Sequence, residues 1–492
     1  MKSSWRLILF SVLMSISTRA DAQYPAWNLA PGTPVEDVDP DYQHAPPEAV
    51  EKWLDMKYGL RIHWGPLAMI GEGDWVLNGM QEFSYDRKKG EMWPDRRELE
   101  HFAFEYLHRE FNPMEFDADR WCDMMVRMGF KYFVFTTKTH CGFANWDTKT
   151  KVKKKLVYVG EKAGQIEDCD MHYSIMETPL KRDIVKELVD AGRQRDLGIG
   201  LYFSHIDLFD ADFRVDSWGH HHPDKNYSRE TDPEGWARLV ARHRDQICEL
   251  LTNYGPIDQL GFDLALSANF WPDMKENIKI ARKLAPNTLF RHRGIARYGD
   301  YHTPENAIPQ GDNPGGYNLP WQLIHTLGDS FFYEPRVSTY RSGKWILTTL
   351  IDSTAKGGNF MISVGPDPWG RFHPEAFKRF EVVGRWLDVN GEAIYGTRPR
   401  KEYQEGDVYF TRTKDDQFVY AISMKWPGEA LTVRSVRARP HSKVSILGDG
   451  GHLEWSQNDE GLVIQIPARL QPEESRPCEH AYVFKIEQGD YN

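Results

Sequence analysis

The sequence predicts an α/β protein, a (β/α)₈-like TIM barrel followed by a C-terminal antiparallel β-sandwich. Before Pro399, short apolar runs alternate with amphipathic helical patterns, which is typical of βα units and a parallel sheet. Polar, aromatic and ionisable residues gather directly after the apolar runs, at the end of the strands where such barrels carry their chemistry. After Pro399, short alternating runs separated by turn residues predict the sandwich.

The first 22 residues have the pattern of a secretory signal peptide. Lys2 and Arg6 precede an apolar run over residues 7–14, and Ala20-Asp-Ala22 supplies an A-x-A cleavage site. The apolar run is too short to span a bilayer. We therefore expect an exported protein without a membrane span, in the periplasm or the medium, whose mature chain begins near Gln23.

Each barrel element is predicted from its own pattern. Amphipathic periodicity predicts helices, and short apolar runs rich in β-branched and aromatic residues predict strands. We expect helices at 46–56, 116–129, 182–195, 236–254, 277–284, 344–355 and 374–390. We expect strands at 60–63, 131–137, 198–204, 257–263, 288–291, 331–333 and 359–364, and an irregular lysine-rich loop at 148–178. A doubly wound fold is disfavoured because no glycine-rich phosphate turn follows the first strand.

The sandwich is predicted from short runs at 409–412, 418–423, 431–433, 444–447, 462–466 and 481–486. The chain thus divides into a signal peptide (1–22), a barrel (23–400) and a sandwich (401–492). Trp426 and Trp455 leave open whether the sandwich binds carbohydrate or only packs against the barrel.

Composition excludes several function classes. Lys and Arg number 61 against 72 Asp and Glu, a net charge of −11, which argues against a nucleic-acid partner. The five cysteines form no CxxC pair, and neither an HExxH motif nor an Asp-rich calcium loop is present. Adjacent His220, His221 and His222 would point to different sides of an extended loop and are poor ligands for one ion. We expect no metal and no cofactor.

Carboxylates remain as candidates for catalysis. Asp263 ends a buried strand, where a barrel enzyme places catalytic groups, although it could also be a cap or an ion-pair partner. Glycoside hydrolysis needs two carboxyl groups. Glu305 follows the next strand, and neighbouring strands place their loops side by side, so both can face one sugar. The residues that compete for the second role are Glu72, Asp74, Asp207 and Asp210.

Six segments match the motifs of one family in the right order. They are residues 57–65, 111–121, 142–147, 251–258, 356–359 with 364–366, and 390–396. Over residues 53–398 the chain resembles the α-L-fucosidases of glycoside hydrolase family 29. The resemblance implies a barrel with a mostly structural C-terminal sandwich, a retaining double-displacement mechanism, and a fucosylated oligo- or polysaccharide as substrate. It says nothing about the oligomeric state.

The resemblance also implies roles for individual residues. Asp263 stands at the position of the nucleophile, and Glu305 at that of the acid/base in many members. Sugar-contacting positions are implied for His63, Trp75, His140 and Arg293, with Tyr202 near the nucleophile. Their neighbours Trp64, Asp74, Thr139 and Arg291 complete the predicted substrate-binding set.

Three departures from the family pattern concern the sugar. Thr139 stands where a histidine is usual, Asp74 where a glutamate is usual, and Arg291-His292-Arg293 where Asn-Asp-Arg is frequent. Lysines in the loop at 149–180 add further positive charge. These features leave open a sulfated fucose or L-galactose in place of plain fucose, or neutral drift. A non-catalytic glycan-binding relative is the other alternative, and the presence of both Asp263 and Glu305 argues against it.

Overall fold

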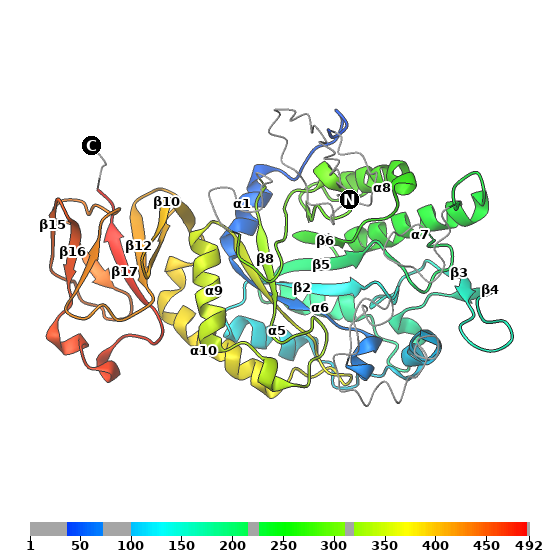
Figure 1. Ribbon diagram of the computed structural model, residues 1–492, viewed down its shortest axis with the longest axis horizontal. Helices are drawn as coiled ribbons and strands as arrows, with labels where there is room; N and C mark the ends of the chain where they lie inside the picture. Colours follow the sequence, from blue (N-terminus) through cyan, green and yellow to red (C-terminus); the bar gives the residue numbers. More distant parts are fainter. Residues whose placement is uncertain (1–36, 72–99, 215–225, 310–318, 490–492) are drawn as a thin grey trace, which may run out of the picture.

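The computed structural model describes residues 37–71, 100–214, 226–309 and 319–489. Glu72, Asp74, Trp75 and the three histidines at 220–222 lie outside these ranges. The larger part of the molecule is built on a parallel sheet, and the smaller, C-terminal part is an all-β unit beside it (Figure 1).

Seven strands form the parallel sheet, in the order β7-β6-β5-β2-β1-β9-β8. Their bounds are β1 Tyr58–Ile62, β2 Tyr132–Lys138, β5 Gly198–Ser204, β6 Gln259–Asp263, β7 Leu289–Phe290, β8 Gln322–Thr326 and β9 Asn359–Val364. Every residue of these strands is buried, as expected for a sheet covered on both faces. This double burial explains the nearly continuous apolar runs.

Residues 301–305 bridge the two edges of the sheet. The N–H of His292 donates to the carbonyl of Tyr301 at 3.0 Å, and the N–H of Gln322 donates to the carbonyl of His302 at 3.0 Å. Parallel bridges join Tyr301 to Arg291 beside β7, and Glu305 to Ile324 in β8. The segment takes the place of an eighth strand, so the sheet closes as a barrel in spite of having seven regular strands.

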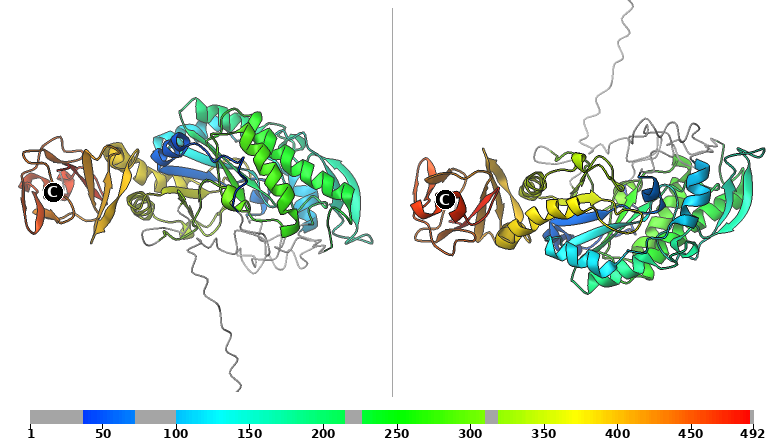
Figure 2. Two further views of the ribbon diagram at one scale, coloured as in Figure 1. Left: turned by 90° about the horizontal axis from the view of Figure 1, so that it is seen from above. Right: turned by 90° about the horizontal axis from the view of Figure 1, so that it is seen from below.

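Helices cover the outside of the barrel (Figures 1 and 2). They are α1 Pro47–Met56, α5 Ala118–Arg127, α6 Ile184–Arg193, α7 Pro233–Thr252, α8 Trp271–Leu284, α9 Gly343–Ala355 and α10 Pro374–Asn390. Asp117, Asp183, Asp232 and Ser342 cap four of them by accepting a backbone N–H from the first turn. Such a cap contributes about 1 kcal/mol, and the sequence places each one directly before an apolar-periodic run.

Two sequence-based predictions for the barrel are wrong. Residues 331–333 are not a strand. The strand of this unit is β8, which was missed because Gln322, His325 and Thr326 give it a polar sequence. The segment predicted as an irregular loop contains an antiparallel hairpin, β3 Val152–Leu156 with β4 Ile166–Met171. The hairpin projects from the barrel, so its strands carry polar residues and lack the apolar alternation of a buried sheet (Figure 1).

The C-terminal unit has two antiparallel sheets, ordered β10-β11-β12-β17-β14 and β13-β16-β15. The strands are β10 Arg398–Glu405, β11 Val408–Arg412, β12 Phe418–Ser423, β13 Ala430–Val433, β14 Val444–Ile446, β15 Trp455–Asn458, β16 Gly461–Gln465 and β17 Tyr482–Glu487. β10 and β15 are additional to the strands predicted from the sequence. The unit packs against α9 and α10, where the indole Nε1 of Trp386 donates to the carbonyl of Ala481 at 2.8 Å (Figure 2).

The tryptophans of the sandwich pack within it. Trp426 donates its Nε1–H to Gln471 at 3.0 Å and lies edge-on to Tyr482, and Trp455 donates to the carbonyl of Ser442 at 3.0 Å. Both are partly buried against the apolar core of the unit, as expected for residues that stabilise the sandwich. In the described ranges, no helix has both the length and the apolar character required to cross a bilayer.

Candidate active site

Asp263 lies at the C-terminal end of β6 with both carboxylate oxygens bonded. The hydroxyl of Tyr202, in the neighbouring strand β5, donates to Oδ2 at 2.6 Å. Arg293 donates from Nη1 to Oδ1 at 3.0 Å, and the backbone N–H of Leu264 donates to the same oxygen at 3.0 Å. Leu264 has a φ of 58°, a left-handed conformation that turns the chain directly after Asp263. The carboxylate is thus held in one orientation at the barrel rim.

The charge of Asp263 is maintained by the surrounding cations. Burial alone would raise the pKa of this carboxyl, but the guanidinium groups of Arg291 and Arg293 outweigh burial and hold the pKa well below its usual range. Burial, together with the charge of Asp263, raises the pKa of the Tyr202 hydroxyl well above its usual value. Tyr202 therefore stays a hydrogen-bond donor, and Asp263 stays an ionised acceptor.

Glu305 is brought to Asp263 by the same two arginines. Its Oε1 lies 2.7 Å from Arg293 Nη2 and 3.2 Å from Arg291 Nη2. Arg291 Nη2 is also 3.8 Å from Asp263 Oδ1, so one nitrogen atom lies close to both carboxylates. The backbone of Glu305 is fixed by its bridge to Ile324 in β8, which places the side chain on the rim beside Asp263.

Arg291 is buried between the two carboxylates. Burial, followed by the positive charge of Arg293, lowers the pKa of its guanidinium to about 10. The group remains a cation at neutral pH. Its positive charge therefore stabilises the carboxylates of Asp263 and Glu305, and its guanidinium is shielded from solvent.

Two predicted histidines lie around this centre. His63 is buried, packs on Phe332 with ring centroids 4.1 Å apart, and has its pKa lowered well below the usual value by burial. His140 is also buried and places Nδ1 2.7 Å from the hydroxyl of Ser204, the last residue of β5. Both imidazoles are therefore held by neighbours from adjoining parts of the barrel rim.

Thr139 precedes His140 and is buried as well. Its Oγ1 lies 3.1 Å from Cys141 Sγ, a contact that one of the two groups donates to the other. Asp74 and Trp75, the other predicted sugar contacts, fall outside the described residues, so their places in the substrate-binding set stay predictions.

Arg61 is a site residue that the sequence motifs do not single out. Its Nη2 lies 3.3 Å from His63 Nδ1, and its guanidinium stacks on the rings of Tyr202 at 4.5 Å and Phe331 at 4.8 Å. It also contributes to the low pKa of Asp263. The available signal was its position two residues before His63 in a strand, because residues i and i+2 face the same side.

Trp64 packs away from the other predicted sugar contacts. Its side chain is fully buried, and it packs edge-on against Phe111 and Trp121 while its Nε1 donates to the carbonyl of Asp367 at 3.0 Å. Alternation along the chain turns it to the face opposite His63. This packing argues against the prediction that Trp64 contacts the sugar.

Asp207 and Asp210 pair with different cations from those that bind Asp263. Arg242 reaches Asp207 Oδ2 at 3.1 Å from Nη2, and Asp210 Oδ2 at 3.2 Å from Nε. Lys138 Nζ lies 3.8 Å from Asp207. Burial raises the pKa of Asp210 to about 7. These groups form a buried ionic cluster between the loop after β5 and Arg242 of α7, so Glu305 is the described carboxylate that shares cations with Asp263.

The lysines of the β3–β4 hairpin do not add free positive charge to the site. Four of them pair with carboxylates of the opposite strand or of a neighbouring helical segment. The pairs are Lys151 and Lys153 with Asp170, Lys154 with Asp168, and Lys155 with Glu105. The expectation that these lysines supply excess cations is therefore wrong, because the fold provides each with an acidic partner.

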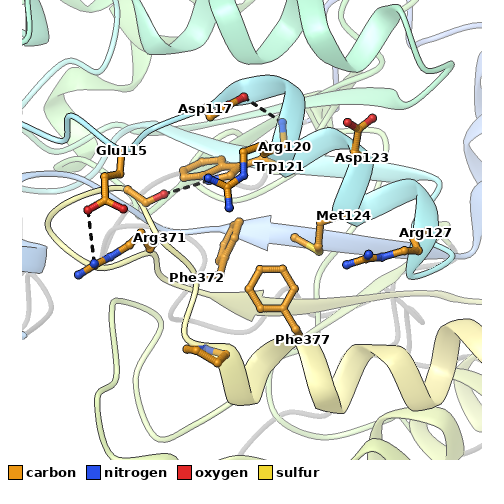
Figure 3. Close-up of a pocket in the computed structure, with 12 residues that line it drawn as sticks. Glu115, Asp117, Arg120, Trp121, Asp123, Met124, Arg127, Arg371, Phe372 and Phe377 are labelled. Carbon is orange, nitrogen blue, oxygen red and sulfur yellow. Dashed lines mark hydrogen bonds and ion pairs between the residues drawn. The ribbon is translucent and has the colours of Figure 1, made fainter.

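A groove of about 550 Å³ between α5 and α10 lies apart from the carboxylates (Figure 3). Phe372 and Phe377 lie within it, and Arg371 pairs with Glu115 at its edge. The lining residues are Glu115, Asp117, Arg120, Trp121, Asp123, Met124, Arg127, Gly370, Arg371, Phe372, Pro374 and Phe377. Two of its carboxylates, Glu115 and Asp123, pair with separate arginines, whereas Asp263 and Glu305 share Arg293, so we place the candidate active site at Asp263.

Two family models match this chain. The model described as Alpha-L-fucosidase matches residues 35–392, and the model described as Alpha-L-fucosidase C-terminal domain matches residues 400–487. The chain belongs to the α-L-fucosidase family. It is a glycoside hydrolase of the fucose-releasing type.

Curated relatives of the family align with nearly the whole chain. Tissue alpha-L-fucosidase of Rattus norvegicus is 26% identical over 503 residues, covering 99% of this chain and 98% of its own. Tissue alpha-L-fucosidase of Homo sapiens is 26% identical over 467 residues, with 91% of each chain covered.

Solved fucosidase structures share the fold. Alpha-L-fucosidase isoenzyme 1 from Paenibacillus thiaminolyticus superposes with a TM-score of 0.71 at 24% identity, covering 90% of this chain and 99% of its own. A family 29 fucosidase from Bacteroides thetaiotaomicron, described as a trapped covalent intermediate with 2-fluoro-fucosyl fluoride in a Glu-to-Gln mutant, superposes with a TM-score of 0.71 at 21% identity, covering 93% and 100%.

Proposed function

We propose that this fucosidase is an exported, retaining exo-glycosidase that releases terminal α-L-fucose from glycans. Asp263 is the nucleophile and Glu305 the general acid/base. The observation that carries the proposal is that Arg293 binds Asp263 Oδ1 and Glu305 Oε1 with its two terminal nitrogens. It thereby holds a fixed pair of carboxylates at the C-terminal rim of a barrel.

In the first step a carboxylate oxygen of Asp263 attacks the anomeric carbon. A bond forms between that oxygen and the anomeric carbon, the bond to the leaving oxygen breaks, and Glu305 gives its proton to the leaving oxygen. Both guanidinium bonds of Glu305 go to Oε1, so we assign the transferred proton to Oε2. The ionised state of Asp263 suits it to this attack.

In the second step Glu305 acts as a base. Its carboxylate takes a proton from water, the water oxygen attacks the anomeric carbon, and the bond to Asp263 breaks. Two displacements at one carbon retain its configuration. Retention requires the carboxyl groups to be about 5–5.5 Å apart, and the position of Arg291 Nη2 within 3.8 Å of both is compatible with that spacing. The covalent intermediate trapped in the Bacteroides fucosidase supports the same course.

The function is tested by the configuration of the sugar first released. With an aryl α-L-fucoside followed by NMR, we expect α-L-fucose before mutarotation produces the β anomer. First release of the β anomer would exclude a glycosyl-enzyme on Asp263. No release of fucose from any fucoside would favour the non-catalytic alternative.

The glycone is proposed to be unsubstituted fucose. Arg291 is paired with Glu305, and the hairpin lysines are paired with their own acids, which removes two grounds for an anionic sugar. The third ground, the smaller side chain of Thr139, is compatible with L-galactose as well as fucose. Assays of α-L-fucosides, their sulfate esters and α-L-galactosides separate these cases by which sugar is released at the highest kcat/KM.

Replacement of the acid/base is expected to depend on the leaving group. Glu305→Gln should lower kcat about 10²- to 10⁴-fold for fucosyl oligosaccharides, because the leaving alkoxide needs a proton. A 2,4-dinitrophenyl fucoside needs no protonation, so its first step should be nearly unaffected. The kcat/KM values of the two substrates, which report the first step, check this, with Glu334→Gln as the control at a buried carboxylate paired with Arg336. Equal losses of kcat/KM on both substrates would remove Glu305 from the acid role.

Export is proposed from the N-terminal pattern. Expression of the full chain in a bacterial host should give a mature protein that begins near Gln23. Mass spectrometry of the protein from the periplasm or medium measures the first residue. A product that retains Met1 and stays with the cells would contradict export.

A further inference from the structure

Two buried histidines connect the active site to the outer helices. His205 follows β5, and its Nε2 lies 3.2 Å from the carbonyl of Arg293. Its Nδ1 lies 3.0 Å from Nε2 of His243 in α7. The Nδ1 of His243 lies 3.1 Å from Nδ2 of Asn277 in α8. We call these three side chains the His205–His243–Asn277 chain.

The His205–His243–Asn277 chain allows one arrangement of protons. Nδ2 of Asn277 also donates to the carbonyl of Val240 at 3.2 Å, which identifies that atom as the amide nitrogen. It therefore donates to His243 Nδ1, an acceptor, and His243 must carry its proton on Nε2. His243 then donates to His205 Nδ1, and His205 donates from Nε2 to the Arg293 carbonyl. Each donor faces one acceptor along the whole chain.

Both histidines are neutral in this arrangement. Burial lowers the pKa of His205 to about 3 and the pKa of His243 well below its usual value, and the nearby Lys138 acts in the same direction on both. Asn277, His205 and His243 are each at most 3% exposed. A solvent molecule cannot readily replace a member of the chain.

His205 is joined to both of the groups that the mechanism needs. Its side chain binds the Arg293 carbonyl, and its backbone N–H donates to the carbonyl of Asp263 at 3.0 Å. The residue after Arg293, Gly294, has a φ of 74°, and a Cβ there would lie 2.2 Å from the carbonyl of Leu264. The turn at Arg293 is therefore tightly packed against the residue that follows Asp263.

We infer that His243 and Asn277 are positioning residues for the fucosidase reaction. Through His205 they fix the backbone of Arg293, and with it the guanidinium that aligns Asp263 with Glu305. They act from α7 and α8 and contact neither carboxylate. This inference rests on the proposed roles of Asp263 and Glu305. It differs from simple filling of the core, because it requires a particular direction of the hydrogen bonds.

Removal of the middle imidazole tests the chain. His243→Leu should lower kcat/KM for an aryl α-L-fucoside by about 10- to 100-fold, and should raise the acid-limb pKa of kcat/KM by roughly one unit as Arg293 loosens from Asp263. His243→Gln can accept from Asn277 and donate to His205, so it should recover most of both. The matched control is His108→Leu, another buried helical imidazole, which should lower stability without moving the acid limb.

Reversal of the hydrogen-bond directions in the His205–His243–Asn277 chain is a second test, and this substitution creates no cavity. Asn277→Asp replaces a donor with an acceptor of the same shape. His243 must then carry its proton on Nδ1 to donate to the new carboxylate, and His205 must carry its proton on Nδ1 to donate to His243. This leaves His205 Nε2 as an acceptor facing the Arg293 carbonyl, and protonation of one histidine would restore the donor. We expect a new ionisation in the pH profile of kcat/KM, with higher activity on its acidic side. Asn390→Asp, a buried helical control that bonds Trp386, should show none.

The outcomes separate the possibilities. If His243→Leu and Asn277→Asp lower the melting temperature but leave kcat/KM and its pH profile as in the unmodified enzyme, the histidines only fill the core and the inference is overturned. If His243→Leu does not fold, the pH profile of Asn277→Asp decides. Activity that survives Asp263→Ala would instead overturn the proposed function, which is a distinguishable result.

Discussion

Replacement of Asp263 by alanine is expected to abolish fucoside hydrolysis, with a loss of kcat on the order of 10⁴-fold or more. The anomeric carbon then lacks its attacking group, while Glu305 and the sugar contacts remain. Steady-state kinetics on an aryl α-L-fucoside measure the loss. Added azide should restore turnover by attacking from the vacated side, and the product should be a fucosyl azide of inverted configuration.

The control lies at the other end of the same strand. Asp258 immediately precedes β6 and pairs with Lys52 at 2.6 Å, at the rim opposite Asp263. Asp258→Asn should alter stability slightly and leave kcat and azide dependence unchanged. Hydrolysis by Asp263→Ala at more than a few per cent of the original rate, or an azide product of retained configuration, would rule out Asp263 as nucleophile.

Replacement of Arg293 by methionine should have the second-largest effect. Arg293 is buried and binds both carboxylates, so its loss leaves two carboxylates at the rim with Arg291 as their remaining close cation. We expect kcat/KM to fall about 10²- to 10³-fold and the protein to lose about 3–5 kcal/mol of stability. Kinetics and chemical denaturation measure the two effects.

The pH dependence of this variant follows from the sign of the shift at Asp263. In the unmodified enzyme its pKa is lowered on folding, so the carboxylate contributes stability that is present above the unfolded pKa of about 3.9 and is lost as pH falls through the folded value. Without Arg293 the folded pKa rises. The acid limb of kcat/KM should therefore move to higher pH, and acid destabilisation should begin at higher pH.

Arg282 provides the matched control for Arg293. It is also buried and pairs with a buried carboxylate, Asp300, but this pair lies between α8 and the segment after β7. Arg282→Met should cost a similar amount of stability and leave the acid limb of kcat/KM in place. An unchanged acid limb in Arg293→Met would mean that Arg293 is structural only.

The order of the elements and the strand that carries Asp263 could be predicted from the sequence. Strands β5 and β9 and helix α10 begin and end at the predicted residues, because a strand buried on both faces and a helix with one apolar side leave clear local patterns. β8 could not be found this way, since its polar residues are buried by contacts with distant segments. The strand predicted at 331–333 is wrong because Phe331 and Phe332 pack against Arg61 and His63 from an irregular segment.

Local periodicity and short motifs were enough to predict the barrel, the sandwich, the family resemblance and the candidate carboxylates. The groups that meet at the site were settled by the folded chain alone. Folding turns Trp64 away from the rim, gives Asp207 and Asp210 to Arg242, and pairs the hairpin lysines with acids. It also places Arg61 beside the carboxylates and the His205–His243–Asn277 chain behind them. Each of these outcomes depends on the direction of a side chain or on a partner distant in sequence. Local sequence patterns contain no information on either.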